Sequence, residues 1–442
     1  MSLLRKSILS AGGTVICAAL GIITQMILSR KLGPDGMGQY QLLLSTSTLA
    51  VAVATLGIGQ ANVYFLNHFN SPKAAVVMNS VYWWAVAGTV LFVGYVGAVK
   101  EFVNYFGRVP IEALLIFGVG LLGVLLVNLL RPVLVAELLM REAVLVTVAA
   151  PSAYLVTVAC LAATTRLSVV QAIIAMAVGN AAGALVCIWF VRDGLKWHER
   201  FDARFFWKLL PHGMQLASSN IVQLASATMG ILLLRHFMHE SFSEVGYYGR
   251  AIAVCGLMQL LSASATPLLY SKWSSVNQAE RTAQVERATR IQTAMGIGIV
   301  FFLLVFGRYL IILLYGHSFL AAVQPLYLLS FAHLIKGPTN IFTNLFAGAG
   351  QPSLNSLIWG ISLPFLVLFS FLLVPRFGIA GAAIAEICSS SASLLAAACV
   401  AGHRYGVDLS QSFVFKGSDL RYICRNILSS KTTVRHANGG AE

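Results

Sequence analysis

Five charged side chains lie within long apolar stretches of this sequence: Arg131, Glu137, Arg250, Lys336 and Glu386. A charge in such a stretch is costly, and it usually faces a protein interior or an aqueous cavity. Three of the five are basic, so together they favour binding of an anionic group. The two carboxylates, Glu137 and Glu386, could exchange protons or bind sodium, and a structural ion pair explains them equally well.

The depth of the three basic residues differs. Arg131 and Arg250 lie near the ends of their apolar stretches, so snorkelling to a lipid headgroup explains each of them as well as ligand binding does. Lys336 lies deeper, directly before Gly337 and Pro338, where a proline kinks a helix. We therefore expect Lys336 to contact the ligand.

Polar residues three or four positions apart, which share one helix face, extend this pattern. One line contains His333, Lys336, Asn340 and Asn344, and a second contains Gln215, Ser219, Gln223 and Ser226. A third runs through Gln41, Ser45, Thr48, Ala52, Thr55, Gly59 and Asn62. We expect these lines to form cavity walls that hydrogen-bond sugars. Tight helix packing through small residues explains the third line at least as well.

The apolar stretches that carry these residues are long enough to cross a membrane. Of 442 residues, 58% are hydrophobic and 10% charged, whereas about a quarter of the residues of a soluble domain are charged. Stretches of roughly 20 apolar residues span about 30 Å of hydrocarbon. We therefore expect an all-α integral membrane protein with about twelve transmembrane helices, at residues 8–29, 40–66, 75–99, 111–136, 143–163, 169–191, 209–234, 246–270, 291–306, 320–347, 353–374 and 379–401.

The two halves of the sequence resemble each other at an offset of about 208 to 210 residues. The segment 28–40 matches the segment 234–248, and 168–172 matches 378–382. Such a repeat predicts two bundles of six helices around a central cavity. The expected domains are an N-terminal bundle at 1–191, a cytoplasmic linker with an interfacial helix at 192–208, a C-terminal bundle at 209–401 and a basic cytoplasmic tail at 402–442.

The formal net charge is +14, and the basic residues concentrate in the connections between apolar stretches and in the tail. Anionic lipid is the expected partner of these residues, rather than nucleic acid. Because positively charged short connections are retained in the cytoplasm, the distribution of Lys and Arg predicts cytoplasmic N- and C-termini.

We expect neither an enzyme nor a bound metal or cofactor. The seven cysteines occur singly, and the spacing of His236, His239 and Glu240 lacks further ligands. The chain contains no GxxxxGK[ST] motif for nucleotide phosphates. The expected outer connections are too short for a catalytic domain, which argues against a membrane glycosyltransferase.

Several segments of the chain are similar to a known family. The stretch 313–389, with LYGHSF, AGAGQPS and VPRFGIAGAAIAE, resembles the second half of Wzx-type polysaccharide flippases. These belong to the multidrug/oligosaccharidyl-lipid/polysaccharide (MOP) exporter superfamily, which includes the MATE transporters. LGPDGMGQYQLLLS near the start and LLPHGMQLASSN in the middle look like other parts of the same family.

The resemblance implies a protein of the bacterial inner membrane that moves polyprenyl-diphosphate-linked oligosaccharides to the outer leaflet for surface polysaccharide synthesis. Family members use cationic residues that line a central cavity, a role that we assign by similarity to Arg131, Arg250 and Lys336. A polysaccharide polymerase and a chain-length regulator are further implied partners. Coupling to H⁺ or Na⁺ stays open.

Three alternatives remain. A MATE-type drug or cation antiporter would favour an acidic cavity, whereas the charges within the apolar stretches here are mostly basic. A lipid II flippase usually has fourteen helices, two more than we expect. A scaffold that does not transport would depend on the basic tail.

Overall fold

The structure, a computed structural model, describes residues 3–69, 72–107, 109–195, 201–238, 240–256 and 278–414. Within these ranges every regular element is a helix, and no strand occurs. Nine helical stretches of the described chain are long and apolar enough to cross a membrane. The expected all-α membrane fold is confirmed.

Two of these stretches each contain two of the expected spans, because the connection between the spans is itself helical. Helix α1 (Leu3–Thr55) bends at Gly33, which has φ 67° and ψ −178°. Helix α12 (Ser353–Tyr405) bends at Gly378, which has φ 56° and ψ −130°. Glycine adopts positive φ without the steric cost that a side chain brings. The expected span at 246–270 is described only to residue 256, and residues 243–256 are helical.

The second expected span, at 40–66, is interrupted. Helix α1 ends at Thr55 and α2 (Ile58–His68) begins three residues later. Leu56 and Gly57 have φ of 45° and 70°. A Cβ atom on Gly57 would lie 2.0 Å from the carbonyl oxygen of Gly213, so the break allows the backbone of another helix to approach closely.

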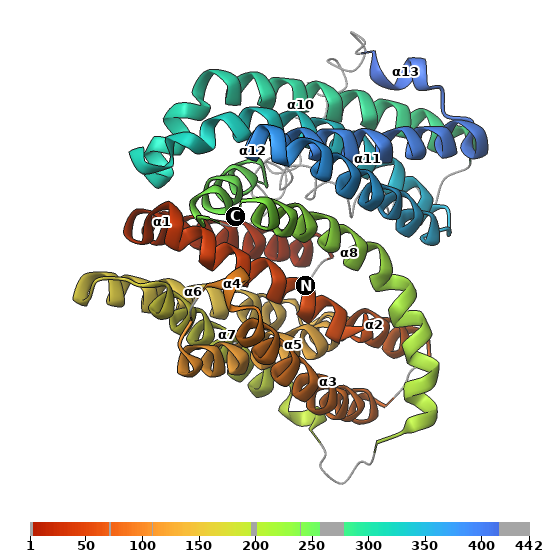
Figure 1. Ribbon diagram of the computed structural model, residues 1–442. Helices are drawn as coiled ribbons and strands as arrows, with labels where there is room; N and C mark the ends of the chain where they lie inside the picture. Colours follow the sequence, from red (N-terminus) through yellow and green to blue (C-terminus); the bar gives the residue numbers. More distant parts are fainter. Residues whose placement is uncertain are drawn as a thin grey trace, which may run out of the picture.

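The N-terminal lobe (residues 3–195) forms the lower group of helices in Figure 1. It contains α1, α2, α3 (Lys73–Glu101), α4 (Val103–Phe106), α5 (Ile111–Ala136), α6 (Met140–Thr164), α7 (Val169–Val191) and the short 3-10 helix η1 (Arg192–Gly194). Small residues bring these helices together. A Cβ on Gly120 of α5 would meet Ala177 of α7 at 2.8 Å, and one on Gly179 would meet the carbonyl oxygen of Ala150 at 2.8 Å.

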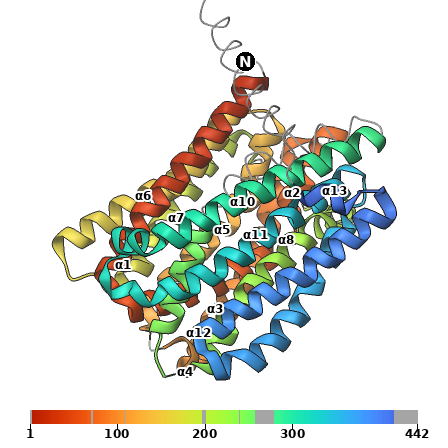
Figure 2. The ribbon, with the colours of Figure 1, turned by 90° about the horizontal axis from the view of Figure 1, so that it is seen from above.

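The C-terminal lobe (the described residues of 203–414) forms, apart from α8, the upper group in Figure 1. It contains α8 (Ala203–Phe237), the helical residues 243–256, α10 (Gln278–Tyr315), the 3-10 helix η2 (His317–Ala322), α11 (Val323–Gly348), α12 and α13 (Leu409–Phe413). From above, the long helices of both lobes run in roughly the same direction (Figure 2).

Helix α8 connects the two lobes and lies between them in Figure 1. It contacts α2 and α1 of the N-terminal lobe as well as α12. Its start, at Ala203, falls within the segment that we expected as a linker, and its Asp202 N-cap exchanges two hydrogen bonds with Asn79 of α3. In the described part of that segment, the aromatic residues Phe205 to Trp207 therefore belong to the first turns of α8 rather than to a separate interfacial helix.

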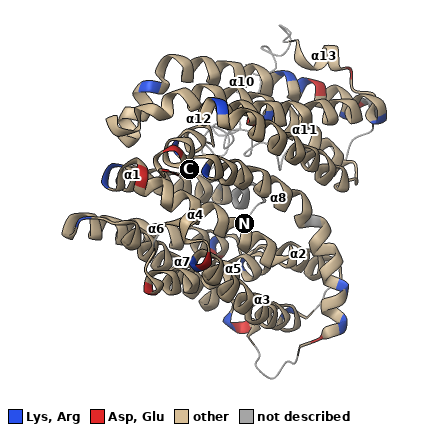
Figure 3. Ribbon diagram, viewed as in Figure 1, with Lys and Arg blue, Asp and Glu red and all other residues tan. Residues whose placement is uncertain are grey.

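The outer faces of the helices are apolar. Val90, Leu185, Phe301 and Leu395 each expose about two thirds of their surface, and most of the ribbon in Figure 3 carries neither charge. Apolar patches of this extent are rare on soluble proteins. They match a protein whose surroundings are lipid.

Candidate functional site

Lys336 and Glu386, which were predicted for different roles, form one ion pair. The Nζ atom of Lys336 on α11 lies 2.5 Å from Oε1 of Glu386 on the second part of α12. The two side chains expose 18% and 11% of their surface. A Cβ on Gly230 would lie 4.0 Å from Oε2 of Glu386 and 3.7 Å from the hydroxyl of Tyr248. The ion pair therefore lies beside α8 and the helix at 243–256.

Arg250, on the same helix as Tyr248, is almost completely buried, with 2% of its surface exposed. Its Nη1 donates to Oε1 of Gln25 at 2.6 Å, and its Nη2 donates to Oε1 of Gln41 at 2.8 Å. Both amides belong to α1, so the guanidinium joins the two lobes. Snorkelling does not describe this side chain, because it is held by neutral groups of the opposite lobe.

The charge of Arg250 has no counter-ion within the described chain. Its hydrogen bonds go to two amides, its Nε has no partner, and its guanidinium carbon lies 5.4 Å from the ring centre of Tyr315. A buried charge without a charged partner destabilises the folded protein, at a cost on the order of several kcal/mol. Arg250 therefore makes the boundary between the lobes electropositive.

A second buried arginine, Arg235 at the end of α8, also joins the lobes, and the sequence analysis did not single it out. Its Nε donates to the carbonyl of Tyr105 at 2.9 Å, and its Nη2 donates to the carbonyl of Asn104 at 3.3 Å. Its guanidinium lies 3.7 Å from the ring centre of Phe242. An arginine at a helix end resembles a residue that snorkels to water, which is why sequence alone did not reveal this role.

Tyr105 reinforces this junction from the N-terminal lobe. Its hydroxyl donates to the carbonyl oxygen of Leu232. Burial raises the pKa of Tyr105 to about 12, although the charge of Arg235 opposes the shift. The hydroxyl therefore keeps its proton, and with it this hydrogen bond, throughout the physiological pH range.

Backbone contact between two glycines closes the same end of the molecule. A Cβ on Gly38 would lie 1.8 Å from the carbonyl oxygen of Phe242, and one on Gly246 would lie 2.1 Å from the carbonyl oxygen of Pro34. Pro34 corresponds to Phe242, and Gly38 to Gly246, at the offset that relates the two halves of the sequence. Each half therefore makes the same glycine-to-carbonyl contact with the other. We call residues 34–41 and 242–250 the closure region.

Arg131 and Glu137 lie inside the N-terminal lobe. Arg131 of α5 donates to Oγ1 of Thr147 of α6 at 2.7 Å. Glu137 follows the end of α5, and its Oε2 lies 2.8 Å from Nζ of Lys73 of α3. The partners of Arg131 and Glu137 are Thr147 and Lys73, not Arg250 or the Lys336–Glu386 pair. The structure therefore does not bring the five predicted charges together in one cluster.

The polar lines have different surroundings. On α11, His333, Asn340 and Asn344 are half-buried, as Lys336 is. On α8, Gln215 is exposed and Ser219 and Gln223 are half-buried. Ser226, by contrast, bonds Ser362 of α12 at 3.0 Å, as a helix-packing contact.

The third line divides between two roles. Gln41 holds Arg250 and donates to Ser45 at 3.0 Å. Farther along, Asn62 is completely buried and donates to Ser80 of α3 at 2.9 Å and to the carbonyl of Leu129 of α5. A Cβ on Gly59 would lie 2.3 Å from the carbonyl oxygen of Asn128. The end of this line that includes Gly59 and Asn62 therefore serves helix packing.

Metal-binding chemistry is not apparent in the described residues, where no group of three His, Cys, Asp or Glu side chains could hold an ion. His239, part of the motif considered above, lies outside these residues.

Comparison with known families assigns the chain. The family model described as polysaccharide biosynthesis protein matches residues 3–241 and 241–436. The chain belongs to this family. The resemblance to polysaccharide flippases, drawn above from short motifs, is thereby confirmed.

Two solved structures show the fold to which this chain is similar. The chain is similar to the inward-facing conformation of a multidrug resistance MATE family transporter of the MOP superfamily, with 14% identity, 90% of this chain and 98% of that chain covered, and a TM-score of 0.74. It is also similar to the inward closed conformation of the lipid II flippase MurJ, with 12% identity, coverage of 97% and 93%, and a TM-score of 0.75. These identities establish the fold alone.

One curated relative is an uncharacterised membrane protein of Methanocaldococcus jannaschii, 33% identical over 82 residues. The match covers 19% of this chain and 16% of the relative. The chain therefore spans about a sixth of the length of that relative.

Proposed function

We propose that this member of the family flips polyprenyl-diphosphate-linked oligosaccharides from the cytoplasmic to the outer leaflet of a bacterial inner membrane, for O-antigen, capsule or exopolysaccharide synthesis. The observation that carries the proposal is Arg250, a buried cation between the lobes whose hydrogen bonds go only to neutral amides. An anionic substrate group would supply the missing counter-charge. A diphosphate is such a group, and the guanidinium fork matches phosphate oxygens well.

Unaided, a lipid-linked sugar does not cross a bilayer, because its hydroxyls and diphosphate would lose their hydrogen bonds to water. In our proposal the lobes enclose these groups in a polar cavity while the lipid tail stays in the membrane. His333, Asn340, Asn344, Gln215, Ser219 and Gln223 are the residues that we propose to contact the sugars.

The Lys336–Glu386 pair supports the same chemistry. Glu386 is the ion-pair partner of Lys336, and in our proposal a substrate phosphate takes its place. If a phosphate replaced Glu386 as the partner of Lys336, the substrate would bind and the lysine would keep a counter-ion in the low-dielectric interior. Protonation of Glu386, or Na⁺ binding to it, would release Lys336, and so Glu386 is our candidate for ion coupling. Glu137, paired with Lys73, is the weaker candidate.

In our proposal the closure region is one gate of an alternating-access mechanism. With the N-terminus cytoplasmic, as the positive charges of the connections predict, the closure region lies on the outer side of the membrane. We propose that residues 34–41 and 242–250 separate to release the substrate outward. An inside-negative potential favours outward movement of a doubly charged diphosphate, by roughly 5 kcal/mol at 100 mV.

The nearest alternative is a drug or cation antiporter, since one similar structure is a multidrug resistance transporter. For that function Glu386 would have to receive a cation, yet Lys336 already holds it at 2.5 Å. The pair and Arg250 favour the anionic substrate.

The test is translocation in liposomes that contain the purified protein. A fluorescent polyprenyl-diphosphate oligosaccharide is placed in one leaflet, and its arrival in the other is followed with and without a membrane potential. We expect movement that depends on the protein and is faster with the potential. No movement of this lipid, together with proton-driven efflux of a cationic dye, would contradict the proposal and support the antiporter.

A further inference from the structure

Two arginines reach across the boundary between the lobes beside the closure region. Arg235 of the C-terminal lobe donates to the carbonyls of Asn104 and Tyr105, as described above. Arg30, on the first part of α1, makes the opposite contact. Its Nη2 donates to the carbonyl oxygen of Leu313 of α10 at 2.5 Å. Each lobe therefore binds the other through an arginine.

Both arginines bind carbonyl groups at a helix end. Leu313 lies in the last turn of α10, and Asn104 and Tyr105 belong to the one-turn helix α4 that follows α3. The last carbonyls of a helix have no partner within it, and the helix dipole attracts a positive charge there. A guanidinium is therefore well suited to both positions.

The two contacts are equivalent in the internal repeat. Tyr105 and Leu313 are separated by the offset that relates the two halves of the sequence. Arg30 and Arg235 lie near the starts of the two matched segments that join the first two spans of each half. Each half thus donates an arginine to the corresponding helix end of the other half. A chance contact of a surface arginine would not recur at the equivalent position.

Both arginines also lie next to the glycine contacts of the closure region. Arg30 comes shortly before Pro34, whose carbonyl oxygen lies against Gly246. The guanidinium of Arg235 lies over the ring of Phe242, whose carbonyl oxygen meets the other glycine of the closure region. The two arginines therefore flank the place where the backbones of the two lobes touch.

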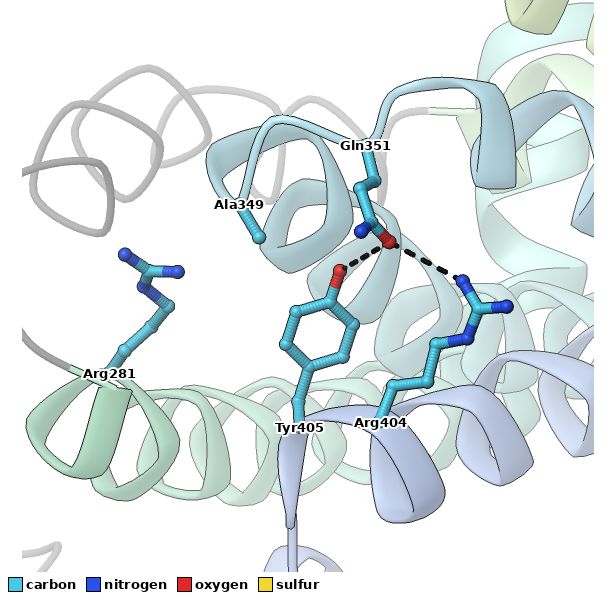
Figure 4. Close-up of a pocket in the computed structure, with 5 residues that line it drawn as sticks. All are labelled: Arg281, Ala349, Gln351, Arg404 and Tyr405. Atoms are coloured by element: carbon cyan, nitrogen blue, oxygen red, sulfur yellow. Dashed lines mark hydrogen bonds between the residues drawn. The ribbon is translucent and has the colours of Figure 1, made fainter.

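At the opposite end of α10, by contrast, an arginine contact stays within one lobe. The hollow in Figure 4 is lined by Arg281, Ala349, Gln351, Arg404 and Tyr405, all of the C-terminal lobe. Nη1 of Arg404 lies 3.5 Å from Oε1 of Gln351, and the hydroxyl of Tyr405 donates to the same oxygen at 3.1 Å. Such contacts persist when the lobes move apart, whereas those of Arg30 and Arg235 must break.

We propose that Arg30 and Arg235 are a matched pair of latches that hold the closure region shut, and that both release their carbonyl acceptors before the lobes separate. This inference rests on the proposed role of the closure region as a gate. The loss of either latch then favours the open state, and the loss of both favours it further.

The two latches differ in strength. Arg30 is exposed, so water can replace its carbonyl acceptor as the lobes separate. Arg235 is 3% exposed. It binds two carbonyls of the N-terminal lobe and also, through Nη1, those of Met238 and Ser241 in its own lobe. Its side chain is thus fixed in the position that binds the other lobe, and Arg235 is the stronger latch.

The experiment measures opening without any substrate. It uses the full-length protein without its native cysteines, purified in detergent and carrying Thr228→Cys. Thr228 is 4% exposed and donates to the carbonyl of Ser45 across the lobes, so the rate of reaction with a soluble maleimide reports their separation. The test variants are Arg30→Gln, Arg235→Gln and the combination of both. Lys31→Gln, which removes an exposed positive charge next to Arg30, is the matched control.

We expect Arg30→Gln to react several-fold faster than the parent, Arg235→Gln to react faster still, and the double variant to exceed both. Lys31→Gln should react at the parent rate. Thermal unfolding checks that each variant is folded. Because Arg235 is buried, the exposed Arg30 carries the test if Arg235→Gln does not fold.

A parent rate in Arg30→Gln, together with a faster reaction of Gly38→Ala, would overturn the latches and leave the gate in place. Parent rates in all of these variants would overturn both. An equal rise in Arg30→Gln and Lys31→Gln would show a general effect of positive charge, and it would also overturn the matched pair. Since no lipid-linked sugar is present, these results are independent of whether the protein flips one.

Discussion

Lys336 and Arg250 keep their charges inside the protein in different ways. Lys336 has a carboxylate partner on a neighbouring helix of the same lobe. Arg250 has only the amides of Gln25 and Gln41, across the boundary between the lobes. The first arrangement can exchange one anion for another, and the second lacks an anion. These two residues therefore define the chemistry that we assign to the site.

Removing both charges of the Lys336–Glu386 pair separates its structural role from its role in transport. Lys336→Met alone leaves Glu386 unpaired, and loss of one partner of a buried pair costs about 3–5 kcal/mol, less where water reaches it. Lys336→Met/Glu386→Gln should unfold close to the wild-type temperature yet translocate at least about tenfold more slowly. Thermal unfolding and the liposome assay measure the two effects. Wild-type translocation by the double variant would show that the pair is structural only.

The charge-reversal variant Lys336→Glu provides a cellular counterpart. It places two carboxylates where we propose that a diphosphate binds, and like charges at close range repel. We expect it to abolish polymer export while the protein still inserts into the membrane, as measured by surface polysaccharide and by membrane fractionation. Normal polymer output would remove Lys336 from the site.

A substrate-binding role of Arg250 is tested by comparing Arg250→Gln with a variant of Gln25, whose side chain accepts a hydrogen bond from the Arg250 guanidinium. Arg250→Gln removes the charge, and a hydrogen bond to a charged group contributes about 1.5–3 kcal/mol, so substrate should bind at least about tenfold more weakly. Gln25→Leu removes one contact of Arg250 but keeps the charge, and we expect it to bind substrate nearly as wild type does. Affinity for the lipid-linked oligosaccharide is the measurement. An equal loss in both variants would identify Arg250 as a clamp between the lobes rather than a substrate contact.

Among the elements, α1 and the helix at 243–256 meet through Gly38 and Gly246. Helices in lipid associate through small residues, because side chains would hold their backbones apart. The 1.8 Å distance from a Gly38 Cβ to a carbonyl oxygen is too short for any side chain to fit without movement. A side chain at Gly38 would therefore push the two helices apart.

Gly38→Ala should accordingly shift the protein toward an open closure region. A cysteine at Thr228, which is 4% exposed and donates to the carbonyl of Ser45 across the lobes, reports opening through its rate of reaction with a soluble maleimide. We expect this rate to rise several-fold in Gly38→Ala. Gly21→Ala on the same helix, where a Cβ meets nothing within 4 Å, is the control. Equal rates in both would show that the crossing does not control access.

Within the described residues most spans were predictable from the sequence, because apolar length alone marks a membrane helix. The structure of the connections between the spans was harder to predict. Gly33–Pro34 and the segment around Gly378 carry residues typical of turns, yet the chain bends there and resumes its helix at once. Proline is favoured in the first turn of a helix, and so Pro34 begins a new segment rather than a loop.

The site was predictable only in part, since its residues meet through packing of the whole molecule. Charge in an apolar stretch was enough to single out Arg250, Lys336 and Glu386 as candidates. The partners were not readable, because Lys336 and Glu386 are 50 positions apart and Arg250 and Gln25 are 225 apart. Arg235 binds backbone carbonyls, which every residue has, so its contacts could not be predicted from the types of its partner residues.

Viewed as a whole, the molecule is two lobes that touch at the closure region and where α8 packs on α1 and α2. Cross-linking this region tests flipping and alternating access together. Asp35, whose Oδ1 accepts from the amide of Phe242 at 2.8 Å, and Phe242 itself are both changed to cysteine in a protein that lacks the native cysteines. Translocation of the labelled polyprenyl-diphosphate oligosaccharide is then measured in liposomes before and after reduction.

The account predicts that the reduced protein moves the lipid at the rate of the parent without the two cysteines, and that the oxidised protein does not move it. Each single-cysteine variant should be insensitive to oxidation. Undiminished movement by the fully cross-linked protein would contradict the central claim, because the lobes would then flip the substrate without separating at residues 34–41 and 242–250.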